Sequence, residues 1–332
     1  METITQILAR ELGQTEVHVQ NVIDLLDEGN TIPFIARYRK ELHGSMDDTV
    51  LRTLEDRLQY LRNLEKRREE VKSAVESQGK LTEELSAAID AAVTLAEVED
   101  LYRPYKPKRR TRATVARERG LEPLAELLFA QGPDCPDPLA AAAAYVDPEK
   151  GVETLADALQ GASDIIAETI SDDAAIRKSL RELVLKRGQL VSKAATEEDT
   201  VYRLYYDFAH SIPRLQGHQI LAINRGEREG ALKAVVVTDR DQALPLLRRA
   251  VVRPGTRAME FMKAVAEDAY DRLLYPSLER EVRNTLTDQA SEGAIHNFAL
   301  NLRPLLMQPP VKGRVTMGLD PGYRMGCKVA VV

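Results

Sequence analysis

The chain of 332 residues is 44% hydrophobic and 30% charged, contains no tryptophan and carries a net charge of −6. Its length predicts two or three domains with hydrophobic cores, and the abundance of Ala, Leu, Glu and Arg is typical of a mostly helical soluble protein. No apolar run approaches the ~20 residues that a membrane-spanning helix needs, and the acidic balance argues against indiscriminate coating of nucleic acid while leaving room for a local basic site.

Two features of the sequence bear on the compartment. The N-terminus is amphipathic and mixed in charge, without the basic-then-apolar order of a signal peptide. Cys135 and Cys327 lie far apart without metal-ligand spacing, which fits a reducing environment, so we expect a cytoplasmic protein.

Hydrophobic spacing predicts a series of helices in the first hundred residues. They are expected within residues 4–12, 17–28, 31–41, 48–78, 81–92 and 94–101. In the third of these, Arg37, Arg39 and Lys40 accompany apolar Phe34 and Ile35. We interpret these cations as structural, with phosphate contact as the alternative.

Residues 102–119 form a basic segment with eight positive charges and a single negative one, that of Glu118. Because the whole chain is −6 and this segment is +7, the remainder of the chain is −13. Pro104 and Pro107 have φ fixed at about −65° and favour extended conformations at Arg103 and Lys106. We therefore expect the cations to lie on a non-helical loop that is held between helices.

Two interpretations of this segment stay open. Cationic side chains on an extended loop can follow a phosphate backbone, while the rings of Tyr102 and Tyr105 offer faces on which bases stack. The alternative is a solvated basic loop that docks onto the acidic remainder of its own chain.

The chain from residue 123 to residue 308 is predicted to be a helical array. Helices are expected within residues 124–130, 139–145, 152–159, 163–170, 173–187, 211–225, 256–274 and 276–307. The apolar run at residues 231–238 predicts a strand, and residues 189–192 are ambiguous. The aromatic residues between 202 and 208 are expected to belong to the core.

The last twenty residues change character. Residues 314–319 and 327–332 predict two strands joined through a turn at Asp320-Pro-Gly. Because a two-stranded hairpin is marginal in water, we expect its domain to continue beyond Val332. The expected fold class is mainly α: a multi-helix N-terminal region with one or two isolated strands, followed by a β-hairpin.

Four stretches together resemble the bacterial Tex family of transcription accessory proteins. They are TIPFIARYRKE at 31–41, DLYRPYKPKRRTRATVARERGLEPLA at 100–125, AINRGEREG at 222–230 and GLDPGYRMGCKVAVV at 318–332. The stretches are spread over the whole chain, and Met325 stands where the family pattern usually has threonine.

The resemblance implies a domain order. In that family a helical N-terminal part precedes a domain of RNase H-like (YqgF-type) fold, followed by helix-hairpin-helix domains and an S1 domain that is the main RNA binder. We accordingly expect an N-terminal helical region at 1–122, a central helical domain at 123–308 and the first hairpin of a truncated RNase H-like domain at 313–332. If the resemblance holds, we expect the helix-hairpin-helix and S1 parts to be absent from this chain.

The function that the resemblance implies is largely sequence-independent nucleic-acid binding in transcription. The expected partners are RNA or DNA, together with RNA polymerase or other transcription proteins, and no membrane. The residues expected to contact nucleic acid are Arg103, Tyr105, Lys106, Lys108, Arg109, Arg110 and Arg112. The alternative is a protein-interaction scaffold that leaves nucleic-acid binding to the absent domains.

Asp320 raises a third hypothesis, a metal-dependent nuclease. Active RNase H-like nucleases place an aspartate on the first strand, where further carboxylates help it to bind two metal ions. A single carboxylate cannot form that site, and the Asp-Pro-Gly turn explains this residue without it. The five histidines form no HExxH or Cys/His pattern. We therefore expect no catalytic residue, no metal and no cofactor, and hence no enzyme.

Overall fold

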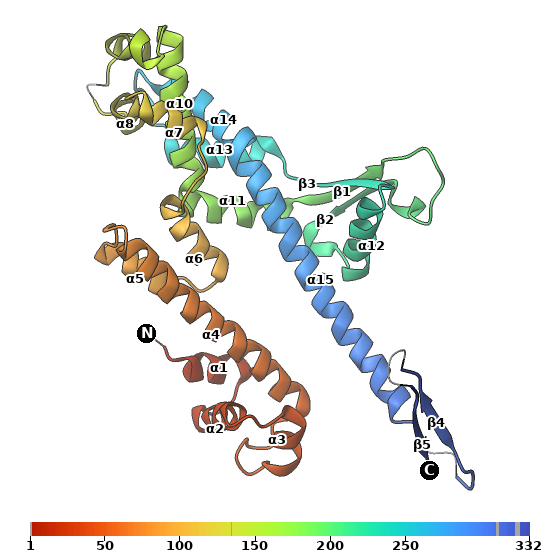
Figure 1. The fold of residues 1–332 in the computed structure, drawn as a ribbon. Coiled ribbons are helices and arrows are strands. Elements are labelled where there is room, and N and C mark those ends of the chain that lie inside the picture. Colours follow the sequence, from red (N-terminus) through yellow and green to blue (C-terminus); the bar gives the residue numbers. More distant parts are fainter. Residues whose placement is uncertain (1, 134, 310–311, 323–325) are drawn as a thin grey trace. The chain divides into compact units, whose positions relative to one another are not determined.

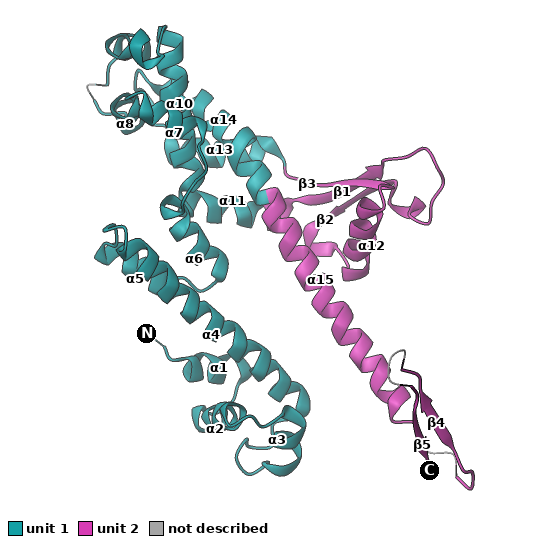
Figure 2. Cartoon of the chain, viewed as in Figure 1, with its two compact units in different colours: residues 1–183, 239–278 teal, residues 184–238, 279–332 magenta. Residues whose placement is uncertain are grey.

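A computed structural model describes residues 2–133, 135–309, 312–322 and 326–332. The fold is mainly α, as the sequence predicts, with a few short strands (Figure 1). Two compact units can be distinguished (Figure 2). Unit 1 comprises Met1–Leu183 and Asp239–Leu278, and unit 2 comprises Val184–Thr238 and Glu279–Val332. Over the described residues, no helix combines the length and the apolar character that crossing a membrane requires.

The N-terminal part of unit 1 is built on one long helix, α4. Three short helices pack against its first half, and two more complete its second half. Their bounds are α1 Ile4–Leu12, α2 Glu16–Asp27, α3 Ile32–Tyr38, α4 Asp48–Glu76, α5 Glu83–Ala91 and α6 Leu95–Tyr102. The starts of α1, α2, α4, α5 and α6 are set by Thr or Asp side chains that accept a backbone hydrogen bond. These helices confirm the sequence prediction for this region.

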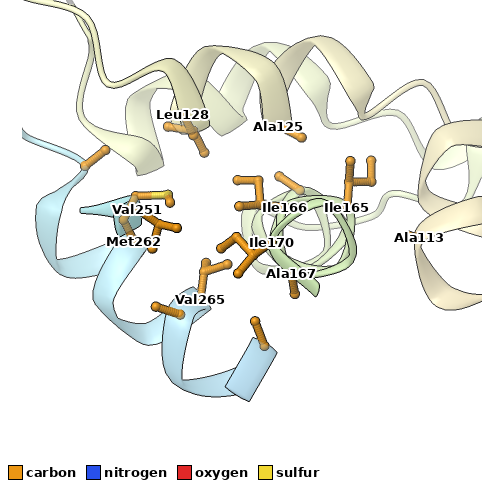
Figure 3. Close-up of a cluster of buried hydrophobic side chains, with 14 of the residues drawn as sticks. Ala113, Ala125, Leu128, Ile165, Ile166, Ala167, Ile170, Val251, Met262 and Val265 are labelled. Carbon is orange, nitrogen blue, oxygen red and sulfur yellow. The ribbon is translucent and has the colours of Figure 1, made fainter. Parts of the chain in front are cut away.

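The remainder of unit 1 is a helical layer around α10. Its bounds and those of its neighbours are α7 Arg112–Glu118, α8 Glu122–Ala130, α9 Pro138–Ala142, α10 Leu155–Asp172, α11 Ala174–Arg187, α13 Arg240–Val251 and α14 Met259–Asp268. A π-helical turn, η6 (Ala269–Leu274), joins α14 to α15 (Tyr275–Leu306). Figure 3 shows α10 side chains such as Ile166 and Ile170 packed among those of α8, α13 and α14.

One correction concerns α10, for which the sequence predicts two helices, at 152–159 and 163–170. The structure has a single helix through Gly161. A Cβ at Gly161 would lie 2.2 Å from Leu121 Cδ1 and 3.3 Å from Ala116 Cβ. The glycine therefore permits close packing of the helices and does not mark the end of one.

Unit 2 contains a three-stranded antiparallel sheet in the order β2-β1-β3. The strands are β1 Gln189–Ala194, β2 Asp207–Ser211 and β3 Leu232–Val237, and α12 (Gly217–Arg228) packs with them around a shared core. The strand predicted at 231–238 is confirmed as β3. The strands are not isolated, however, because β1 pairs with both of the others. The strand β2, which is only five residues long, was not predicted from the sequence.

The C-terminal hairpin is formed by β4 (Met317–Asp320) and β5 (Lys328–Val331), with Met317 opposite Val331 and Asp320 opposite Lys328. This confirms the two predicted strands, all of whose residues are exposed. Membership of an RNase H-like domain and the domain boundaries at 1–122, 123–308 and 313–332 stay predictions. Met325 lies outside the described residues.

Candidate nucleic-acid interface

The basic segment begins at a buried ion-pair cluster. Asp100, near the end of α6, is 3% exposed. It accepts a hydrogen bond of 2.6 Å from Arg177 Nε and another from Arg181, both on α11. Arg177 is itself fully buried. Losing one partner of such a cluster would leave a charge buried without compensation, so the start of the segment is strongly fixed.

The backbone of the segment is only partly extended. After α6 it forms a short 3₁₀ turn, η1 (Arg103–Tyr105), and residues 106–111 contain no helix or strand. Thr111 then caps α7, where its side chain accepts the backbone N–H of Thr114 at 3.1 Å. The expectation of a non-helical loop up to residue 119 is therefore wrong for its second half, because Arg112 already lies on a helix.

Three cations of the segment are directed to carboxylates of the same unit. Lys106 pairs with Glu99 and lies 5.5 Å from the centroid of the Tyr102 ring. Lys108 pairs with Asp172 and also lies 3.5 Å from Glu168. Arg117, on α7, donates a hydrogen bond of 2.8 Å to Glu168. We call Lys106, Lys108 and Arg117 the inner cations.

Glu168 is the centre of this arrangement. Its side chain is 12% exposed and also accepts a hydrogen bond of 3.0 Å from the Thr111 hydroxyl. Burial by itself raises the pKa of Glu168, but the hydrogen bond from Arg117 and the charge of Lys108 outweigh burial and lower the pKa below its ordinary value. The carboxylate is thus held charged, and it fixes the segment to α10.

A pocket of about 660 Å³ lies along the inner cations. Its lining includes Lys108, Arg117, Glu168, Asp172 and Asp173. Four cations (Lys80, Lys106, Lys108 and Arg117) and four carboxylates (Glu122, Glu168, Asp172 and Asp173) line it, so the pocket offers no excess of positive charge to an anion. We therefore interpret the pocket as part of the ion-paired contact between the segment and α10.

Three other cations of the segment, Arg109, Arg110 and Arg112, are exposed, and we call them the outer arginines. Arg110 has one partner, Glu118, at 2.9 Å, and both side chains are more than half exposed. Surface pairs of this kind contribute only about 0–1 kcal/mol. Among the described residues, Arg109 and Arg112 have no hydrogen bond or ion pair. Together with Arg119, which is also exposed, these three guanidiniums are the accessible positive charge of the segment.

Two further predicted site residues lie partly inside. Tyr105 is half-buried against the apolar cluster of α4, α5 and α6, and its carbonyl accepts a hydrogen bond of 3.0 Å from Gln78. Arg103 is also half-buried. The seven predicted residues therefore share one segment, but only the outer arginines combine exposure with weak or absent pairing.

The residues that hold the segment were not predicted from the sequence. Asp100 lies in the stretch 100–125 that resembles the Tex family, but its partners are far away in the sequence. Glu168 and Asp172 lie on a helix that comes much later in the chain. Their spacing in the sequence carries no signal of these pairs. Only the excess of acidic residues outside the segment suggested that such partners exist.

The remaining candidate, Asp320, is exposed at the end of β4. Within the residues that the structure describes, no group of three or more His, Cys, Asp or Glu side chains is arranged to hold a metal ion. Cys135 is buried and Cys327 is exposed, and neither is in a disulfide.

Comparison with known proteins supports the resemblance read from the sequence. Residues 2–76 match the family model described as Tex-like protein N-terminal domain, and residues 134–298 match the one described as Tex central region-like. The chain is 46% identical to the Bacillus subtilis protein YdcI over 340 residues, which cover 100% of the chain and 47% of that protein.

Two other relatives are similar over 99% of the chain. Identity is 39% to the Transcriptional accessory protein Tex of Neisseria gonorrhoeae, of which 44% is covered. It is 36% to the human S1 RNA-binding domain-containing protein 1, of which 34% is covered. The chain thus spans less than half the length of these relatives. The two family models and the similarity along the whole sequence lead to one conclusion: the chain belongs to the Tex family.

Proposed function

We propose that this chain is a nucleic-acid-binding part of a transcription accessory factor and that it acts by contact, without catalysing a reaction. The observation that carries the proposal is the set of outer arginines, exposed on a segment that is itself fixed at both ends. The names of two relatives, a transcriptional accessory protein and an S1 RNA-binding domain-containing protein, favour the same role.

The physical basis is the chemistry of an unpaired guanidinium. Arginine presents several N–H donors in a planar fork that matches phosphate oxygens, and such charge-assisted hydrogen bonds are strong. Arg109 and Arg112 keep all these donors available among the described residues, and Arg110 would exchange one solvated carboxylate for a phosphate. Binding to phosphate carries no base information, so it should tolerate any sequence.

The inner cations have a different role in this proposal. Lys106, Lys108 and Arg117 use their charge on Glu99, Asp172 and Glu168 and thereby position the outer arginines. The half-buried Tyr105 offers little of its ring to a base. The proposed contact set is thus narrower than the seven residues that the sequence suggests.

The test is fluorescence anisotropy of the chain with labelled single-stranded RNA and duplex DNA over a salt series. Substituting Arg109→Gln, Arg110→Gln and Arg112→Gln together should weaken binding to both and reduce the salt dependence. For each phosphate that is no longer neutralised, the slope of log K against log salt should become shallower by about 0.7 for single strands and about 0.9 for the duplex.

A matched control removes three paired cations elsewhere in unit 1, of which Arg52 and Lys66 are exposed and Lys263 is half-buried. Arg52, Lys66 and Lys263 each pair with a carboxylate three or four residues away on their own helix. Their triple substitution by Gln changes the net charge equally and should leave the slope unchanged. Equal effects of the two triple variants would show that the segment is no specific site. Labelled strands should also remain intact in Mg²⁺, and their cleavage would contradict the non-catalytic proposal.

A second candidate function is a protein-interaction scaffold. It is favoured by the pairing of Lys106, Lys108 and Arg117 with acidic residues of the same unit, as in a loop that docks on its own chain. If the wild-type chain binds neither RNA nor DNA at low salt, the scaffold is the better explanation. Co-precipitation with purified RNA polymerase would then test it directly.

A further inference from the structure

A second group of cations and aromatic rings lies at the C-terminal end of α3. The guanidinium carbon of Arg37 is 5.7 Å from the centroid of the Tyr38 ring, and that of Arg39 is 5.2 Å from the centroid of the Phe34 ring. The two rings are 5.2 Å apart and tilted by 48°. Guanidiniums and rings therefore alternate over this end of the helix, and Lys40 follows directly. We call Phe34 and residues 37–40 the α3 cluster.

The α3 cluster is accessible and lacks carboxylate partners. Tyr38 is 55% exposed, and Arg37 and Lys40 are also exposed. Arg39 donates a hydrogen bond of 3.1 Å to the carbonyl of Tyr38. In the part of the chain that the structure describes, no acidic side chain pairs with any of the three cations.

The arginines of the neighbouring helix α4, in the same part of unit 1, differ from those of the α3 cluster because they pair with carboxylates. On α4, Arg57 forms two hydrogen bonds with Glu11, of 2.7 and 2.8 Å, and Arg62 forms two of 2.7 Å with Asp27. These bonds lower the pKa of both carboxyls, whose charges are thus neutralised by the arginines of α4. The cations of the α3 cluster keep their charge uncompensated.

The backbone beneath the α3 cluster is well fixed. α3 packs against α2 and α4 (Figure 1) and buries Ile32 and Ile35 almost completely. The turn that follows is tied to α2 by a hydrogen bond of 2.9 Å from the Asn21 side chain to the Leu42 carbonyl. A site presented on such a frame loses little conformational entropy when it binds a ligand.

Interaction of cations with the end of the helix explains only part of this arrangement. Carbonyls at a helix C-terminus attract cations, and the bond from Arg39 to a carbonyl fits that role. It does not explain why Tyr38, an aromatic side chain, is directed to solvent beneath an arginine. An exposed ring among uncompensated cations is the arrangement that binds unpaired bases together with their phosphates.

We propose that the α3 cluster is a second contact site for single-stranded nucleic acid, in which a base stacks on Tyr38 and phosphates bind Arg37 and Lys40. The site uses residues separate from the outer arginines, so it goes beyond the function proposed above. Because bases within a duplex are already stacked and paired, the ring is available only to single strands.

The first experiment isolates the stacking interaction. Tyr38→Ala and Tyr38→Phe variants are compared by fluorescence anisotropy on a labelled single-stranded oligonucleotide and on an abasic oligonucleotide of the same length. Tyr38→Ala should weaken binding of the base-bearing strand about tenfold and leave binding of the abasic strand unchanged. Tyr38→Phe, which keeps the ring, should bind as the wild type does. Equal weakening on both strands, or none on either, would overturn the proposal.

The second experiment isolates the binding of phosphates. The double variant Arg37→Gln/Lys40→Gln should make the salt slope for a single strand shallower by about 1.4, because each neutralised phosphate contributes about 0.7. Arg52→Gln/Lys66→Gln is the control with the same charge change on exposed, paired side chains. An identical slope in the two double variants would overturn the proposal. The residues changed are exposed, and thermal unfolding checks that each variant folds.

Crossing these variants with the triple substitution of the outer arginines separates the two proposals. Weaker single-strand binding only in the α3 variants would support the α3 cluster and contradict the basic segment as a site. Weaker binding only in the triple variant would overturn the α3 cluster and leave the basic segment. Independent weakening in both is the expected result, and absence of binding by the wild type would overturn both.

Discussion

Asp100 links the basic segment to the helical layer of unit 1 through two arginines. Its carboxylate is the acceptor for the fully buried Arg177 and for Arg181, and it is nearly inaccessible to water. A guanidinium that cannot be deprotonated must find its counter-charge inside the protein. Asp100 is therefore a structural residue within a stretch whose composition suggests ligand binding.

The corresponding prediction is a large loss of stability for Asp100→Asn. The amide keeps the size of the side chain but removes the charge, so the free energy of unfolding should fall by about 3–5 kcal/mol, as measured by urea denaturation. Asp48→Asn removes the partner of Arg52 in a solvent-accessible pair and should cost less than about 1 kcal/mol. Similar losses of stability in the two variants would mean that burial of the cluster does not matter.

A second residue-scale prediction concerns Glu168 and pH. Its pKa is lowered in the folded state, so its contribution to stability is fully present above the ordinary pKa of a glutamate and is lost as the pH falls through the folded pKa. Glu168→Gln should therefore cost more stability at pH 7 than at strongly acidic pH. Unfolding free energies of both proteins at several pH values check this, and a difference that is constant with pH would contradict it.

At the scale of elements, the close approach of α10 to its neighbours reverses a usual rule. Replacing glycine by alanine inside a helix normally stabilises it by up to about 1 kcal/mol. At Gly161 the new methyl group would meet Leu121 Cδ1 at 2.2 Å, so Gly161→Ala should instead destabilise unit 1 by about 1–3 kcal/mol. Gly293 on α15 has no atom within 4 Å of such a methyl group, and Gly293→Ala should stabilise. Urea denaturation of the two variants gives the sign of the change in the free energy of unfolding for each.

The elements that could be predicted are those with local determinants. The side chain of Thr94, for example, accepts the backbone N–H of Glu97 and so defines a helix start within three residues. Gly161 was misleading in the sequence because its role depends on Leu121, which lies elsewhere in the chain. The strand β2 could not be predicted because it is short and is defined by its pairing with β1. Interactions between residues distant in sequence therefore limited the prediction.

At the scale of the whole molecule, the segregation of charge could be predicted from the sequence, but the arrangement of those charges in space could not. The excess of cations at 102–119 is a property of composition. Which of them are directed inward depends on Glu168 and Asp172, whose distance from Lys108 in sequence hides the pairing. The sequence therefore predicted which segment holds the candidate site. The structure distinguishes the inner cations from the outer arginines within that segment.

The order of segments in unit 1 has a consequence for synthesis on the ribosome. The apolar face of α10 is covered partly by α13 and α14, which are made only after the three strands of unit 2 (Figure 3). Those strands are consecutive in the chain, so their sheet can pair while α10 is still incompletely covered. A nascent chain therefore carries an incompletely covered hydrophobic helix while residues 173–268 are being made, and this is the interval in which chaperone protection matters most.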